Sequence, residues 1–140
     1  MGILYPVPTE RQRLIKKLDQ VFSRYIRTRV ADERGFSPCF TSGIVKHWTE
    51  MDAGHFMSRA CMSTRWNVKN VQCQSKRDNA FRGGEQFKFG QELDKKYGEG
   101  TAQELYHLSK TTKKYGVHEL REMIEVFKVE CERINEEKGL

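Results

Sequence analysis

The run Asp52-Ala53-Gly54-His55 places a carboxylate three residues before an imidazole. Imidazole titrates near neutral pH, and so His55 is suited to act as a general base. The carboxylate of Asp52 is a hard oxygen ligand for a divalent cation. Because Gly54 has no side chain, we expect it to leave room for a metal ion or a phosphate to approach the backbone.

Two asparagines follow this run, Asn70 and Asn79. A strand histidine, an intermediate asparagine and a helix-borne asparagine near an aspartate make up the composition of a one-metal phosphodiesterase site. In such a site the ion takes the scissile phosphate oxygens and the histidine activates water. The alternative is that His55 is a hydrogen-bonded structural histidine and the asparagines cap turns. The residues by themselves leave both interpretations open.

The first of three segments, residues 9–31, is predicted to be an amphipathic basic helix. Thr9 and Gln12 fit a capping box at its start. Its apolar stripe is Leu14, Leu18, Val21, Phe22 and Tyr25. The remaining surface is largely basic, so this helix either lies on DNA phosphates or is a solvated cover of the core.

The second segment, residues 35–84, is punctuated by glycine and proline and carries the candidate site. We predict strands over residues 44–48 and 51–56, paired as a hairpin. Residues 59–71 have no clear period, which predicts a long loop. A short helix is expected over residues 76–82, ended by Gly83 and Gly84.

The third segment, residues 85–140, is predicted to be helical. A first helix ends near Tyr97-Gly98, and Thr101 with Glu104 forms a second capping-box pattern. A long C-terminal helix carries the stripe Leu120, Met123, Ile124, Phe127, Cys131 and Ile134. The expected class is α+β, with residues 1–140 forming one domain.

The 140-residue chain carries a net charge of +6, concentrated in its front part. Residues 1–90 hold 16 basic and 8 acidic residues, which suggests a face for a polyanion. No apolar run approaches the ~18 residues of a membrane span, and the N-terminus has no signal-peptide pattern. We therefore expect a soluble, intracellular protein whose four cysteines are reduced thiols.

The linked motifs of the middle segment resemble the phage NinG (Rap) recombination nucleases, a family of the HNH or ββα-metal endonucleases. The resemblance covers roughly residues 36–135. It is carried by Asp52-Ala53-Gly54-His55-Phe56, Ser58-Arg59, Ser63-Thr64-Arg65-Trp66, Asn70-Val71, Asn79 and Gly83-Gly84. It implies a ββα-metal core, a hairpin plus a helix, flanked by the N-terminal helix and the C-terminal helices.

The resemblance also implies roles for single residues. The catalytic set is His55 as general base, Asn70 as the residue that braces the loop behind it, and Arg59 as a phosphate-holding residue. Asp52 and Asn79 are the implied ligands of one Mg²⁺ or Mn²⁺ ion. Asp52 shares strand parity with Gly54, the position that precedes the base and that often supplies the ligand.

The function implied is metal-dependent hydrolysis of DNA phosphodiester bonds in phage recombination. The partner is DNA, as duplex and possibly branched or single-stranded, in the cytoplasm of a bacterial host. Residues expected to bind DNA are Arg24, Arg27, Arg65, Lys69, Lys76, Arg77 and Arg82. The alternative is a non-catalytic DNA-binding module that keeps the HNH-like shell, and a more distant one is a protein–protein adaptor.

The chain departs from the family pattern at two cysteine pairs that usually hold a structural zinc. The first pair is replaced by Cys39 and Ser42, and the second by Ser75 and Asp78. Neutral serine hydroxyls do not replace thiolates on zinc. We therefore expect no structural zinc, with ordinary packing holding the hairpin and the loop.

Overall fold

Helix α1 (Glu10–Thr28) begins at the predicted capping box. Oγ1 of Thr9 accepts the N–H of Gln12 at 3.1 Å, and Oε1 of Gln12 accepts the N–H of Thr9 at 2.8 Å. The structure, a computed structural model, describes residues 2–140. Leu18, Phe22 and Ile26 of α1 are buried, as the apolar periodicity predicts.

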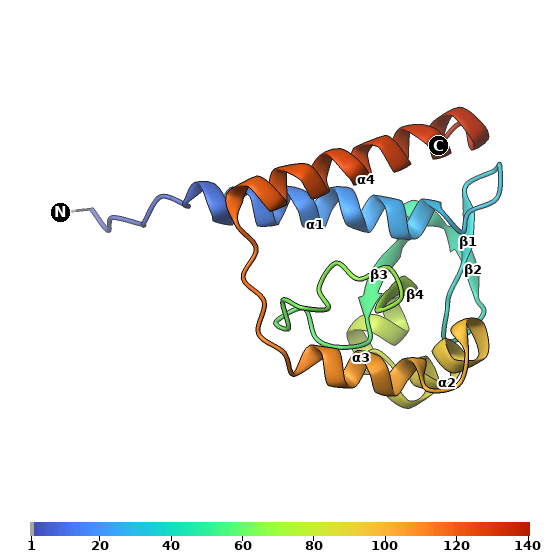
Figure 1. Cartoon of the computed structure of the whole chain (residues 1–140). Helices are drawn as coiled ribbons and strands as arrows, with labels where there is room; N and C mark the ends of the chain where they lie inside the picture. Colours follow the sequence, from blue (N-terminus) through green and yellow to red (C-terminus); the bar gives the residue numbers. More distant parts are fainter. Residues whose placement is uncertain (1) are drawn as a thin grey trace.

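Helix α4 (Val117–Lys138) runs parallel to α1, and the two lie side by side in Figure 1. The pair is tied at both ends: Nε of Arg11 donates to the carbonyl of Tyr115 at 3.0 Å, and Nζ of Lys138 donates to that of Thr28 at 3.2 Å. The main core forms between them and the strands. Its buried members are Leu18, Phe22, Ile26, Trp66, Val71, Leu120, Ile124 and Phe127.

Four short strands form two separate antiparallel pairs. Strand β1 (Phe36–Pro38) pairs with β2 (Val45–His47), and β3 (Met51–His55) pairs with β4 (Val71–Ser75). Both predicted strands exist, but the prediction that they pair with each other is wrong. The short 3₁₀ helix η1 (Trp48–Glu50) separates β2 from β3, and each strand finds its partner elsewhere in the chain.

The predicted long loop joins β3 to β4, and the predicted short helix follows β4. The latter is a single turn of π-helix, η2 (Arg77–Phe81). Such turns are rare in proteins, and those that occur often lie at functional sites. Gly83 and Gly84 then adopt positive φ angles of 60° and 81°, which favour glycine and end the turn.

Helices α2 (Gln86–Tyr97) and α3 (Thr101–Ser109) pack through Phe89, Leu93 and Leu105. The predicted capping box at Thr101 is wrong. The N-cap is Gly100, and the Thr101 hydroxyl donates to the Gly98 carbonyl at 2.7 Å instead.

The fold is of the predicted mixed α+β class. Figure 1 shows strands β3 and β4 between the α1–α4 pair and the helices α2 and α3. Helix α1 contacts both of these strands, and its Asp19, Ser23 and Arg27 lie near Asp52 and His55 of β3. Within residues 2–140, every helix is too short or too polar to cross a membrane.

Candidate active site

A polar cavity of about 460 Å³ lies where α1, β3 and η2 meet. It brings together residues that are far apart in the sequence. The side chains that give it its chemistry are Asp19, Arg27, Asp52, His55, Arg59, Lys76 and Asn79. Four of the predicted catalytic and metal-binding residues, Asp52, His55, Arg59 and Asn79, therefore line one cavity.

His55 is held in one orientation by the loop that follows β3. Its Nε2 lies 3.0 Å from the backbone carbonyl oxygen of Arg65. A carbonyl oxygen only accepts, so Nε2 carries the proton and Nδ1 holds the free lone pair in the neutral ring. Nδ1 has no hydrogen-bond partner among residues 2–140. Burial disfavours the imidazolium and lowers the pKa of His55, although the hydrogen bond to Arg65 opposes this.

The Asp52 carboxylate is paired with the ammonium group of Lys76. Its Oδ1 lies 2.6 Å from Nζ of Lys76, and its Oδ2 accepts a hydrogen bond from Nδ2 of Asn79 at 3.0 Å. The π-helical turn and the residue before it thus deliver two polar groups to one carboxylate. The Asp52 side chain is 24 % exposed, so this carboxylate is accessible from solvent.

These residues fit a divalent cation by the chemistry of their donor atoms. Carboxylate and amide oxygens are the ligand types of Mg²⁺ and Mn²⁺. Mg²⁺ takes one or two carboxylates and leaves its other positions to water and phosphate, which suits a pair such as Asp52 and Asn79. A metal ion at Asp52 would have to displace the ammonium group of Lys76. No cluster of three or more His, Cys, Asp and Glu side chains within residues 2–140 has the arrangement of a metal site.

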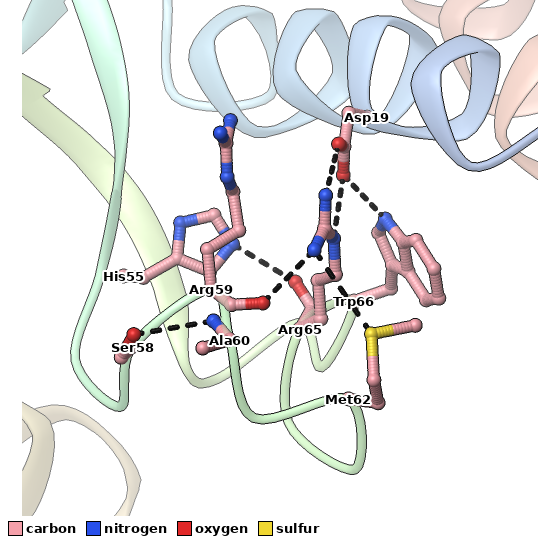
Figure 2. A network of polar contacts seen from close by, with 8 residues as sticks. All are labelled: Asp19, His55, Ser58, Arg59, Ala60, Met62, Arg65 and Trp66. Carbon is pink, nitrogen blue, oxygen red and sulfur yellow. Dashed lines mark hydrogen bonds and ion pairs between the residues drawn. The ribbon is translucent and has the colours of Figure 1, made fainter. Parts of the chain in front are cut away.

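Asp19 anchors the loop that orients His55, and the sequence analysis did not single it out. Its carboxylate accepts from Nε and Nη2 of Arg65 at 3.1 and 2.5 Å, and from Nε1 of Trp66 at 2.9 Å. Figure 2 shows the resulting chain of contacts from α1 through Arg65 to the His55 ring. An acidic residue on the inner side of a basic helix was the available signal.

The Arg65 guanidinium is therefore committed to the protein itself. Its side chain is only 15 % exposed, and Nη1 also donates to the Arg59 carbonyl at 3.0 Å. A phosphate-holding role would require Arg65 to leave Asp19. We assign Arg65 a positioning role.

The Arg59 guanidinium, in contrast to that of Arg65, is not paired within the part of the chain that the structure describes. It makes no hydrogen bond or ion pair with any residue of 2–140, and the side chain runs beside the His55 ring toward α1 (Figure 2). It lines the main cavity and an adjoining one with Asn79, Gly83, Gly84 and Gln86. An unpaired guanidinium at this position is available for a phosphate.

Asn70 lies behind the site and is fully buried. Its Oδ1 accepts the N–H of Met57 at 2.8 Å, and its Nδ2 donates to the carbonyls of Met57 and Thr64 at 3.1 and 3.0 Å. The side chain thus ties both ends of the β3–β4 loop together. Because it lies outside the cavity, its contribution is to hold the loop that carries Arg59 and Arg65.

The space beside Gly54 is filled by protein, which differs from the expectation that a ligand would approach there. A Cβ at Gly54 would lie 2.1 Å from Oε1 of Gln74, the β4 residue that pairs with Asp52. Gln74 is fully buried and donates to Oγ1 of Thr41 and to the Gly84 carbonyl. Glycine is required at this position for packing.

The two predicted DNA-binding residues of α1, Arg27 and Arg24, differ in the contacts that their side chains make within the protein. Arg27 lines the cavity, but its Nε donates to the Ser23 carbonyl and its guanidinium lies 5.0 Å from the centre of the Trp48 ring. Burial lowers the pKa of Arg27. The guanidinium of Arg24 also lies over the Trp48 ring, 5.1 Å from its centre, and Arg24 lines a groove between α1 and α4.

The remaining predicted DNA-binding residues lie outside the main cavity, apart from Lys76. Arg77 and Arg82 are exposed at the two ends of the η2 segment, and Arg82 is 3.7 Å from Glu85. Lys69 is exposed and lies 5.4 Å from the ring centre of Tyr97, in a region lined by α3. The structure therefore gathers Arg27, Arg59 and Lys76 at the cavity and leaves Lys69 away from it.

The four positions at which the resemblance implies zinc thiolates also meet in space, around Cys39. Sγ of Cys39 accepts the N–H of Ser75 at 3.1 Å and lies 3.8 Å from Oδ2 of Asp78. Thr41 donates to the same Oδ2 at 2.5 Å. Burial raises the pKa of Cys39, but hydrogen bonds from Ser42, Thr41 and Ser75 outweigh it and leave the pKa lowered.

Comparison with known proteins identifies one family. The sequence model of the family described as "Bacteriophage Lambda NinG protein" matches residues 8–137, which is nearly the whole chain and includes every residue of the cavity. No curated protein matches the chain, and no solved structure does.

Proposed function

The chain belongs to the family of the bacteriophage lambda NinG protein, and from this premise we propose that it is a metal-dependent DNA endonuclease with His55 as its general base. The observation that carries the proposal is the state of His55. Its Nε2 is bound by a backbone carbonyl, its Nδ1 is free, and it shares a cavity with an oxygen-ligand pair and an unpaired arginine. This is the set of groups that phosphodiester hydrolysis requires.

The proposed reaction assigns one task to each residue. Nδ1 of His55 takes a proton from a water molecule, whose oxygen bonds to phosphorus as the bond to the leaving oxygen breaks. Arg59 binds the phosphate, and Asp52 and Asn79 hold a Mg²⁺ or Mn²⁺ ion. When bound, this ion supplies charge stabilisation for the phosphate and the leaving oxygen. Asp19, Arg65 and Asn70 position the loop.

The order of elements supports an HNH-like core. Strands β3 and β4 pair antiparallel, and the helical turn η2 follows β4 directly. His55 ends the first strand of this unit and Asn79 lies in the turn, the positions that the ββα-metal resemblance implies. A role in phage recombination, on duplex or branched DNA, completes the proposal.

The test is cleavage of labelled duplex, single-stranded and four-way-junction DNA with Mg²⁺, Mn²⁺ or EDTA. We expect cleavage that requires the metal, and a loss of about 10²–10⁴-fold in His55→Ala. His118→Ala is the matched control, because His118 is 86 % exposed on α4 and pairs only with Glu122. His55→Ala protein that cleaves like the parent would refute the assignment.

A second function is favoured by one contact, the ion pair between Lys76 and Asp52. A lysine ammonium group that occupies the Asp52 carboxylate in place of a metal ion is compatible with a DNA-binding module that does not cleave. The same assay separates the two functions. DNA that is bound but left intact with every metal would support the binding module.

A further inference from the structure

We propose that Phe81 and Phe87 form a stacking site for unpaired nucleobases at the rim of the candidate active site. The inference rests on the proposed function, because it concerns the DNA that this site receives. It assigns a role to two side chains that neither the mechanism nor the core uses.

Both rings are exposed to an extent that core packing does not explain. Phe81, at the end of η2, is 85 % exposed, and Phe87, in the first turn of α2, is 82 % exposed. By contrast, Phe89 and Leu93 of α2 are fully buried. Single exposed apolar residues are common. Here, however, two phenylalanines bracket one five-residue turn, Arg82–Gln86, that closes one side of the site.

The turn itself is fixed to the site. Nε2 of Gln86 donates to the His55 carbonyl at 3.4 Å, and Nε2 of Gln74 donates to the Gly84 carbonyl at 2.8 Å. Gly83, Gly84 and Gln86 line the adjoining cavity of about 280 Å³ together with His55 and Arg59. Phe81 lies two residues after Asn79, and Phe87 directly follows Gln86. Both residues therefore border the turn that lines the cavity of the candidate base, and their exposed side chains lie outside that cavity.

The basic residues near Phe81 and Phe87 favour an anionic ligand. Arg77 and Arg82 flank Phe81, and Lys88 follows Phe87. Arg82 and Lys88 face Glu85 and Glu92 at 3.7 and 2.9 Å. Arg77, and Arg59 inside the rim, make no ion pair with any residue of 2–140. Aromatic rings interleaved with basic groups suit a strand whose bases stack and whose phosphates are anionic. Bases inside a duplex already stack on one another, so the rings gain a partner only where bases are unpaired.

The test measures binding without cleavage, in EDTA, by fluorescence anisotropy with a labelled single strand and with its duplex. We expect Phe81→Ala and Phe87→Ala each to weaken single-strand binding by about fivefold or more, and to change duplex binding by less than about twofold. Phe81→Trp should restore binding, because tryptophan also stacks. Tyr106→Ala is the control, because Tyr106 is an exposed aromatic residue on α3, away from the Arg82–Gln86 turn.

The possible outcomes separate this inference from the proposed function. Binding of both DNA forms that is unaffected by the two alanine changes overturns the stacking site alone. An equal loss for single strand and duplex also overturns it. A change in oligomeric state in Phe81→Ala or Phe87→Ala assigns the rings to a protein contact instead. Failure of the parent protein to bind any DNA overturns both proposals.

Discussion

Replacing Asp19 by alanine should destabilise the fold and the candidate site together. The change removes a carboxylate that accepts three hydrogen bonds, two from Arg65 and one from Trp66. It leaves a guanidinium that is only 15 % exposed without its counter-charge, and an indole N–H without its acceptor. Breaking a buried ion pair from one side costs about 3–5 kcal/mol. Since Asp19 itself is 22 % exposed and water can reach the gap, we expect about 3 kcal/mol.

Urea denaturation of the parent and of Asp19→Ala would measure this loss in the free energy of unfolding. A loss of 3 kcal/mol corresponds to a fall in Tm of about 10 °C for a domain of this size. Glu125→Ala is the matched control, because Glu125 pairs with Lys128 at 3.5 Å on an exposed face of α4. We expect the control to change stability by less than about 0.5 kcal/mol.

A double-mutant cycle makes the prediction sharper. Arg65→Met removes the buried charge, so adding Asp19→Ala to it should cost much less than Asp19→Ala alone. Cleavage by Asp19→Ala, measured where the variant is still folded, should also fall, because the Arg65 carbonyl that holds His55 is displaced. A stability loss under about 1 kcal/mol, or full additivity in the cycle, would refute the anchoring role of Asp19.

Three further predictions concern the titration of the base, its neighbouring cation and the end of α1. Because burial lowers the pKa of His55, the neutral base persists below pH 6.5, and the acid limb of kcat/KM for cleavage should lie below that value; a limb above pH 7 would contradict this. Lys76→Met removes a competing cation from Asp52 and should tighten Mn²⁺ binding by up to about fivefold in calorimetry, whereas weaker binding would show that Lys76 does not compete. Arg29→Ala removes donors from the Val71 carbonyl and from Oε1 of Gln72, so thermal unfolding should report a loss of about 2 kcal/mol; an unchanged Tm would make these bonds dispensable.

The helices could be predicted from the sequence because their signals are local. The capping box at Thr9 and the apolar stripe of α4 lie within a few turns of the residues they organise. Strand β4 could not be predicted in this way. It is buried throughout, yet Gln72 and Gln74 are polar, and their partners come from distant segments such as Thr41 and Tyr97. The wrong hairpin has the same cause, since pairing register depends on contacts across the chain.

The candidate site shows the same division. Residue types and spacing were enough to single out Asp52, His55 and Asn79, and the family resemblance added Arg59; the fold brings all four to one cavity. What the spacing could not reveal is which cations are already paired. The sequence suggests Arg65 as a phosphate ligand, but in the fold its guanidinium is paired with Asp19, which lies 46 residues away in the sequence.

The hydrogen-bonded cluster around Cys39 has a consequence for how this part of the chain folds. A site of four thiolates completes its fold only when zinc is supplied and the thiols are reduced. The contacts among Cys39, Thr41, Ser75 and Asp78 form from the chain's own donors and acceptors, so this corner can assemble during synthesis whatever the zinc supply. Folding and metal loading then become separate events. If Asp52 and Asn79 hold a metal ion as proposed, a metal titration of the folded protein should report on them, and a second tightly bound ion at Cys39 would contradict the expectation of no structural zinc.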